Sequence, residues 1–386
     1  MLSSSVYPLA NPKGVKLLCE LCKKTAHYMC TQCRVTYYCD LEHQKADWIG
    51  IHEKICQLLI PLRTSIPFFS SEKERWHSQQ QIVQRQKHMI DLTRTVAQKL
   101  LFEGKPDEAI PGALQSLRFA TSVYGTTSAE LVPSYLLLAE ASIGLGQLQD
   151  AEEYLSQAQW TVMKTSECIT GVEYKLYRNL GLLYSARGNY EKALWYLADD
   201  IYHASEVFGT EDIHTAGGYF HMANVFFGQG KMDIADSMYT EVVDIWHKHL
   251  SELVEAEMEK PKWKRMNAAL EDPDPGMEDY KESLDVAQQA EAVQVLNAIN
   301  NIRDQGFVPK HGRIGKVAHA LAMLYYVIMD YRKVIDYGSQ ALEESKLLLN
   351  NDKEIESIEN LLEMAHSALG YPGGQGPSPT AWVTSC

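Results

Sequence analysis

The chain has 386 residues, of which 45% are hydrophobic and 22% charged, so it has enough apolar material for a sizeable core and is not wholly disordered. Its net charge of −14 argues against sequence-independent nucleic-acid binding. No apolar run reaches the ~18 residues of a membrane span, and Met1–Ala10 lacks the features of a secretory signal, so we expect a reducing, intracellular compartment and no membrane partner.

Residues 1–18 are interpreted as a short leader, and a cluster of potential metal ligands occupies residues 19–56. Six of the eight cysteines lie in this cluster, which in a reducing compartment indicates a metal site rather than disulfides. The cluster contains two Cys-x2-Cys pairs and two pairs spaced by four residues. Its eight candidate ligands are enough for two closed tetrahedral zinc sites: Cys19, Cys22, Cys30, Cys33, Cys39, His43, His52 and Cys56.

These ligands can be shared between two ions in sequential or interleaved order. Sequential pairing would join the two Cys-x2-Cys pairs around one ion and leave a weak core. Interleaved pairing, which we favour, cross-links a 38-residue segment that is too small to fold by burying apolar surface alone. Its two sets are Cys19, Cys22, Cys39 and His43 for the first zinc, and Cys30, Cys33, His52 and Cys56 for the second. Neither set leaves an open position, so both ions are expected to be structural.

The ligand pattern resembles the MYND-type zinc finger, including Val35–Cys39 (VTYYC) and His52–Cys56 (HEKIC). In that family the ligands interleave, and the usual sixth ligand is a cysteine where this chain has His43. MYND fingers are generally protein-interaction modules, and some bind proline-containing peptides. The aromatic candidates for such a surface are also candidates for the core of the finger: Tyr28, Tyr37, Tyr38 and Trp48.

Residues 57–71 contain Pro61 and Pro67 and are interpreted as a connector, and residues 72–250 as helical repeats. Glycines recur every 42 residues in these repeats, and an alanine follows each of them by five residues: Gly104, Gly146, Gly188 and Gly230. This period predicts an α-solenoid of stacked helical hairpins. The third unit, Tyr177-x2-Leu180-Gly181-x2-Tyr184, is closest to the tetratricopeptide pattern. The long period resembles the repeats of kinesin light chains.

The remaining segments are a charged loop over residues 251–283, degenerate repeats with a capping helix over 284–369, and a disordered tail over 370–386. In the last hairpin we place Asp330 at the turn-glycine position. His247 and His249 are two residues apart on a predicted helix and point to opposite sides, so they make a poor metal site. The predicted fold class is therefore mostly α, with a two-zinc finger at its N-terminus.

The sequence contains no G-x-S-x-G, Walker A or His-Glu-x-x-His motif. Lysine methyltransferases of the SET-and-MYND class also join a finger to tetratricopeptide-like helices, but they need SET segments on both sides of the finger. Only 18 residues precede Cys19, and no Asn-His pair occurs. We therefore predict that the protein is not an enzyme and has no small-molecule substrate.

The order of the parts resembles a ciliary family that joins a MYND finger to tetratricopeptide repeats. The resemblance rests on the leader Tyr7–Ala10, the finger, Ala46–Trp48, His52–Arg63 and the long repeats. It implies a cytoskeletal adaptor of the ciliary and sperm-flagellar axoneme, whose partners are inner-arm dynein subunits and a second tetratricopeptide protein. The alternative is a co-chaperone or nuclear co-regulator that binds peptides through the finger.

Overall fold

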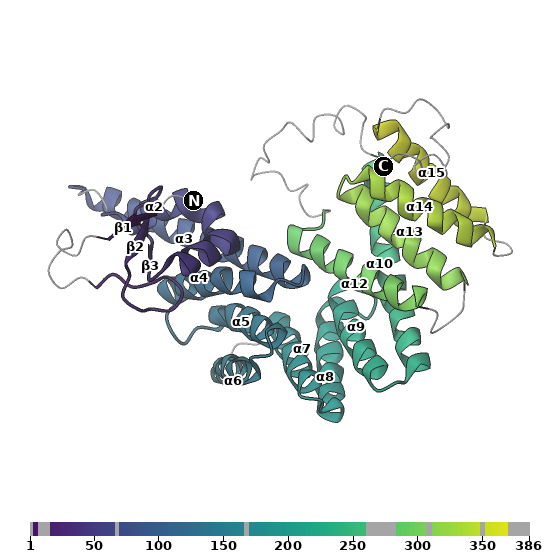
Figure 1. Ribbon diagram of the computed structural model, residues 1–386, viewed down its shortest axis with the longest axis horizontal. Coiled ribbons are helices and arrows are strands. Elements are labelled where there is room, and N and C mark those ends of the chain that lie inside the picture. The colour runs from purple at the N-terminus through teal and green to yellow at the C-terminus, as the bar shows by residue number, and fades with distance from the viewer. Residues whose placement is uncertain are drawn as a thin grey trace. The chain divides into compact units, whose positions relative to one another are not determined.

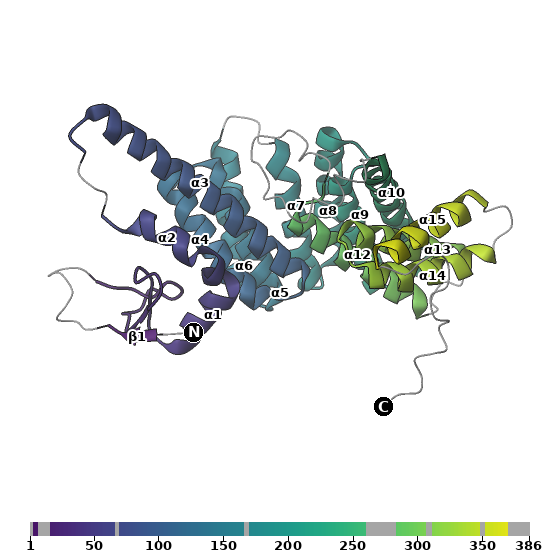
Figure 2. The same ribbon diagram turned by 90° about the horizontal axis from the view of Figure 1, so that it is seen from above.

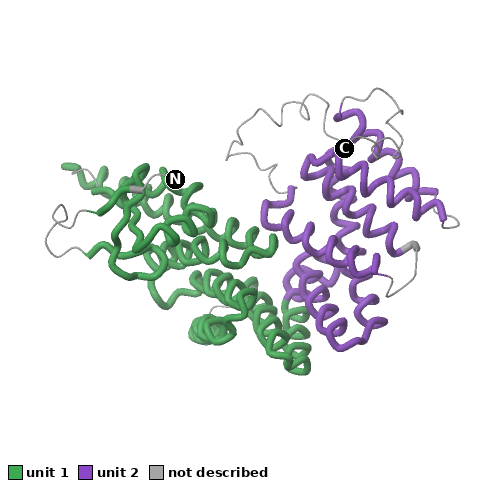
Figure 3. Tube along the Cα trace, in the orientation of Figure 1, with its two compact units in different colours: residues 1–203 green, residues 204–386 purple. Residues whose placement is uncertain are grey.

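The computed structural model describes residues 3–6, 16–65, 69–165, 170–259, 283–305, 311–347 and 352–369. The chain is mostly helical, with helical hairpins after a small N-terminal finger, which confirms the predicted fold class (Figure 1). It divides into two compact units, residues 1–203 and 204–386 (Figure 3). None of the described helices is both long and apolar enough to cross a bilayer. The predicted tail and most of the predicted loop lie outside the described residues.

The finger begins the first unit. Its antiparallel sheet has the order β1 (Ser3–Ser5), β2 (Tyr28–Cys30) and β3 (Tyr37–Tyr38). Its helical part comprises α1 (Leu41–Asp47), a π-helical segment (Trp48–His52) and α2 (Glu53–Arg63). The leader therefore supplies an edge strand. The polar Ser3–Ser5 run has no apolar alternation that would have predicted one.

Helical hairpins complete the first unit, and the partner helices of a hairpin lie side by side (Figure 2). They are α3 (Glu72–Phe102) with α4 (Pro106–Tyr124), α5 (Val132–Gly144) with α6 (Leu148–Lys164), and α7 (Thr170–Ala186) with α8 (Tyr190–Phe208). The alanines five residues after the turn glycines, Ala109, Ala151 and Ala193, are fully buried. Their small side chains allow the close helix crossings that the repeat pattern predicts.

The second unit contains the hairpin of α9 (Ile213–Gly228) and α10 (Met232–Glu259). The helices that follow are α12 (Val286–Asp304), α13 (His311–Val327), α14 (Tyr331–Lys346) and α15 (Asp352–Ala368). Tyr239 and Trp246 of α10 are buried in one apolar cluster with Leu296 of α12 and Leu321 of α13. The degenerate C-terminal repeats thus share a continuous core with the last regular hairpin.

Two helices continue past the boundaries expected from sequence. Helix α2 runs to Arg63, so the first half of the predicted connector is helical, and α10 runs to Glu259, into the predicted loop. Leu59 of α2 is fully buried, and Leu253 of α10 is 9% exposed. Both helices extend because these apolar residues continue the buried stripe, whereas the prediction weighted prolines and charges.

The turn glycines adopt left-handed backbone conformations: φ is 72° at Gly104, 71° at Gly146, 74° at Gly188 and 75° at Gly230. In the last hairpin Met329 takes this conformation, with φ 67°, and not Asp330 as predicted. Asp330 instead caps α14, because its side chain accepts a hydrogen bond from the Lys333 backbone N–H. The prediction was therefore displaced by one residue.

Replacing Met329 by glycine is expected to raise the free energy of unfolding by about 0.5–1 kcal/mol, because glycine adopts positive φ without a steric penalty. The Met329 side chain is 60% exposed, so its loss removes little packing. Urea denaturation monitored by circular dichroism measures the change. The reverse change at a regular turn, Gly188→Ala, should lower the free energy of unfolding by a similar amount. If both variants changed this free energy in the same direction, the placing of Met329 at the turn-glycine position would be contradicted.

Replacing Gly181 by alanine is expected to lower the free energy of unfolding by about 1–3 kcal/mol through overpacking. A Cβ built at Gly181 lies 2.6 Å from Leu197 Cγ, whose side chain is fully buried in the facing helix. A Cβ built at Gly171 of the same helix meets no other atom within 4 Å. Gly171→Ala is the matched control and should leave stability unchanged or slightly higher.

Candidate metal centre

The finger gathers the eight predicted ligands into two groups, and within each group the ligand atoms all lie within 4.8 Å of one another. The groups are Cys19, Cys22, Cys39 and His43, and Cys30, Cys33, His52 and Cys56. In the first, Sγ of Cys22 and Sγ of Cys39 are 3.5 Å apart. In the second, Sγ of Cys30 and Sγ of Cys56 are 4.0 Å apart. Thiolates at the corners of a tetrahedral zinc site are separated by about 3.8 Å, so both donor sets fit the ion.

Each Cys-x2-Cys pair forms the same tight turn. The residue after the first pair, Lys23, has φ 60°, and the residue after the second, Arg34, has φ 59°. The Lys23 N–H donates to the carbonyl of Cys19 at 3.2 Å, and the Arg34 N–H donates to that of Cys30 at 3.0 Å. The turns therefore aim both thiols of a pair toward one point.

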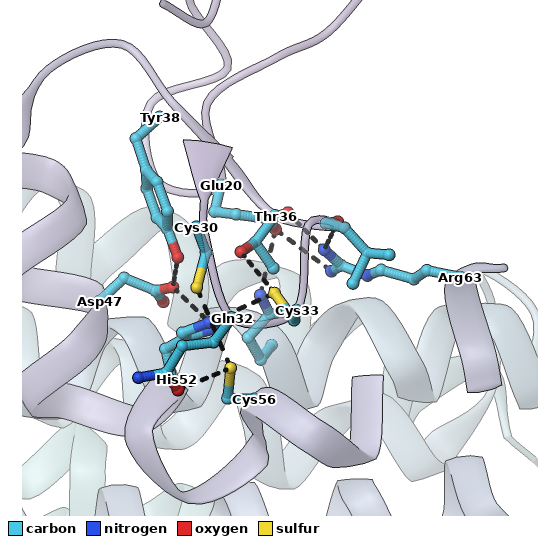
Figure 4. A network of polar contacts seen from close by, with 12 residues as sticks. Glu20, Cys30, Gln32, Cys33, Thr36, Tyr38, Asp47, His52, Cys56 and Arg63 are labelled. Carbon is cyan, nitrogen blue, oxygen red and sulfur yellow. Dashed lines mark hydrogen bonds and ion pairs between the residues drawn. The ribbon is translucent and has the colours of Figure 1, made fainter. Parts of the chain in front are cut away.

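The second group has a buried carboxylate behind its histidine (Figure 4). Asp47 Oδ2 accepts a hydrogen bond from the Tyr38 hydroxyl at 2.6 Å and lies 3.7 Å from His52 Nδ1. The carboxylate favours a proton on Nδ1, which leaves a lone pair on Nε2. Nε2 is 3.6 Å from Cys33 Sγ, so it points into the metal group. Burial raises the pKa of Asp47, although Tyr38 and His52 act against this rise.

The first group is more open to solvent. Its histidine, His43, presents Nδ1 to the group, 3.0 Å from Cys39 Sγ. Cys39 lies two residues before α1, so it reaches His43 from the segment that precedes the helix and not from the same helical turn. Asp40 caps the start of α1 between these two ligands, because its Oδ1 accepts a hydrogen bond from the His43 backbone N–H at 2.7 Å. The His43 side chain is 36% exposed, whereas all four ligands of the second group are buried.

Glu20, between the first two cysteines, joins the finger to the first hairpin. Its carboxylate accepts hydrogen bonds from Arg63 of α2 at 2.5 Å, from Arg118 of α4 at 2.7 Å and from Gln115 at 3.1 Å. Burial alone would raise the pKa of Glu20, but the two arginines outweigh it and hold the pKa below the usual 4.5. No local pattern in the sequence marks Glu20 as a functional residue, because its partners are 43 and 98 positions away.

Apolar packing reinforces this junction. Ile51, Ile55 and Leu59 of the finger share a buried cluster with residues of α3 and α4. A Cβ built at Gly50 would lie 2.5 Å from the Glu108 carbonyl oxygen, so only glycine permits this close approach to α4. The helical face of the finger is therefore part of the core of the first unit.

The aromatic residues of the finger divide into two kinds. Tyr38 is fully buried, and burial next to Asp47 raises its pKa, so it belongs to the core and not to a binding surface. Tyr28, Tyr37 and Trp48 are half-buried. Trp48 packs against His52, with 5.6 Å between the ring centroids. The predicted aromatic surface is therefore reduced to these three residues, one of which also shields the second metal group.

The family model for the MYND finger matches residues 19–56. The chain is also similar to the crystal structure of BtubC (BKLC) from P. vanneervenii, with 16% sequence identity, a TM-score of 0.31, and coverage of 73% of this chain and 85% of that one. The family match covers the segment that holds both Cys/His groups. The chain thus contains a MYND finger suited to two structural zinc ions, followed by helical hairpins.

Proposed function

We propose that the protein is a non-catalytic adaptor that binds another protein through its third hairpin. A MYND finger and helical hairpins are both architectures of protein binding. The observation that carries the proposal is a ladder of half-buried aromatic rings on α7 and α8. Tyr184 stacks on Tyr196 with 5.4 Å between ring centroids, and Tyr177 stacks on His203 at 5.1 Å.

Two more exposed rings flank this ladder. Trp195 is 62% exposed and Tyr202 is 58% exposed, and their spacing of seven residues places them on one face of α8. Trp195 also contacts Tyr196 edge-on at 4.8 Å. Exposed tryptophan and tyrosine side chains on a rigid helix are typical anchors of protein interfaces.

The charge around the ladder indicates the chemistry of the partner. After burial, the carboxylates of Asp199 and Glu173 raise the pKa of Tyr177, so both lie within electrostatic range of the rings. The ladder is thus acidic at its Tyr177 end, whereas Lys192 Nζ lies 5.0 Å from the ring centroid at its Tyr184 end, so we expect a partner segment that places basic residues at the Tyr177 end of its apolar contact. Within an axoneme, tubulin would be the most abundant possible partner, but its surfaces are acidic, and this chain has a net charge of −14. We therefore propose a contact with an accessory or motor subunit and not with tubulin.

The finer proposal is an adaptor of the ciliary and sperm-flagellar axoneme, which docks or stabilises inner-arm dynein together with a second tetratricopeptide protein. It is supported by the resemblance of the whole order of parts to zinc finger MYND domain-containing protein 12. On this proposal the protein resides in the cytoplasm and cytoskeleton, at the axoneme.

Extraction of cilia that express tagged protein tests this proposal. We expect the wild-type protein to remain with the axoneme in detergent and to leave with dynein in high salt. The double variant Trp195→Ala/Tyr202→Ala should be lost already in detergent. Trp76→Ala, which removes an equally exposed ring (66%) from α3, is the matched control and should behave as wild type. Release of wild-type protein by detergent alone would favour the co-chaperone or co-regulator alternative.

A further inference from the structure

A second cluster of potential metal ligands lies in the second unit, apart from the finger. It brings together His247 of α10, His319 of α13 and Glu354 of α15, whose ligand atoms all lie within 4.8 Å of one another. His247 Nε2 is 3.1 Å from His319 Nδ1, and His319 Nδ1 is 3.8 Å from Glu354 Oε1. The partner of His247 is thus His319, 72 residues away, and not the neighbouring His249.

The packing of α10 on α13 fixes the two imidazoles. Asp244 and Lys316 form an ion pair at 2.7 Å one turn before them, and Ser251 donates to Met323 Sδ at 3.5 Å one turn after them. All three pairs have the same sequence separation, so the helices are in parallel register at this point. The site is therefore built on rigid elements and not on a loop.

Hydrogen bonding does not account for the burial of His319. Its side chain is 2% exposed, and its Nε2 is buried without a hydrogen-bond partner. A hydrogen bond from His247 would satisfy Nδ1 only, and the Glu354 oxygen at 3.8 Å is too far to accept one. A cation could be held by His247 Nε2, His319 Nδ1 and the Glu354 carboxylate, which face one another, and the proton of the His319 ring would then lie on Nε2.

We propose that His247, His319 and Glu354 form a third zinc site, which ties α15 to α10 and α13. Two histidines and one glutamate form a known zinc donor set, whose ligand atoms are separated by about 3.4 Å at bond lengths of about 2.1 Å. The histidine nitrogens, 3.1 Å apart, are close to this spacing, and the Glu354 oxygen lies 3.8 Å from His319 Nδ1.

The number of zinc ions per full-length chain, measured by plasma mass spectrometry after dialysis against buffered zinc, tests the site. We expect three ions for the wild type, two from the finger and one from this cluster. Glu354→Gln should lower the affinity for the third ion at least about tenfold. Glu359→Gln, which changes an exposed residue of the same helix, is the matched control and should retain three.

Titration of the metal-free protein with Co²⁺ gives an independent readout that does not depend on a variant folding. The first two equivalents should produce thiolate-to-cobalt charge-transfer absorption, and the third should add ligand-field bands without it. Two ions in the wild type, three ions that Glu354→Gln leaves unchanged, or a third equivalent with thiolate absorption would each overturn the proposal.

Discussion

Removal of zinc by a chelator is expected to unfold the finger and to release α2 from the first hairpin. Structural zinc contributes about 10–16 kcal/mol of apparent binding free energy in small modules, and that energy is the folding energy of the finger. The protein atoms left behind form a small cluster, in which Tyr38 is the largest fully buried side chain. Trp48 fluorescence and proteolysis between residues 64 and 71 would report the loss, whereas the helical circular dichroism of the hairpins should largely remain.

The two sites are expected to empty in order. The first group contains the half-exposed His43, Cys22 and Cys39, so the chelator and protons reach it before the buried second group. Cys22→Ser should therefore be tolerated better than Cys56→Ser, and readdition of zinc should restore the wild-type signal. Unchanged Trp48 fluorescence after complete removal of zinc would contradict a structural role for the ions.

The ligand grouping could be predicted from sequence because it depends on local spacing. Two tight Cys-x2-Cys turns and two i, i+4 pairs leave few ways to complete four-coordinate shells. The groups that support the ligands could not be predicted in this way. Asp47 is only five residues from His52 but faces its imidazole because a π-helical segment lies between them, and Arg118 reaches Glu20 only after the finger folds onto α4. A single sequence contains no local pattern that records such contacts.

The hairpins were predictable for a related reason, since a left-handed turn repeats wherever glycine repeats. The glycine pattern failed at the last hairpin turn, where the residue type differs but the backbone conformation is the same. Met329 adopts the same positive φ as the turn glycines, but without glycine the register was displaced by one residue. The His247–His319 pair could not be predicted either. Its two residues are 72 positions apart, and this separation is not a multiple of the 42-residue repeat period.

Replacing Glu20 by glutamine is expected to lower the free energy of unfolding of the first unit by about 3 kcal/mol. The substitution keeps the size of the side chain but leaves Arg63 and Arg118 facing each other without a counter-charge, and breaking one partner of a buried pair is costly. Urea denaturation at neutral pH, followed by Trp48 fluorescence, measures the change. Because Glu20 has a lowered pKa, the difference from wild type should be full above pH 4.5 and shrink as pH falls through the folded-state pKa.

Zinc content separates this electrostatic effect from damage to the metal sites, since Glu20 is adjacent to Cys19. The variant should bind as much zinc as the wild type, and Glu153→Gln on the exposed face of α6 should leave stability unchanged. Adding Arg118→Met to the Glu20 variant should recover part of the loss, because it removes one uncompensated charge and retains an apolar stem. Strictly additive losses in this cycle would show that Glu20 and Arg118 are not coupled, which would contradict an ion pair across this junction.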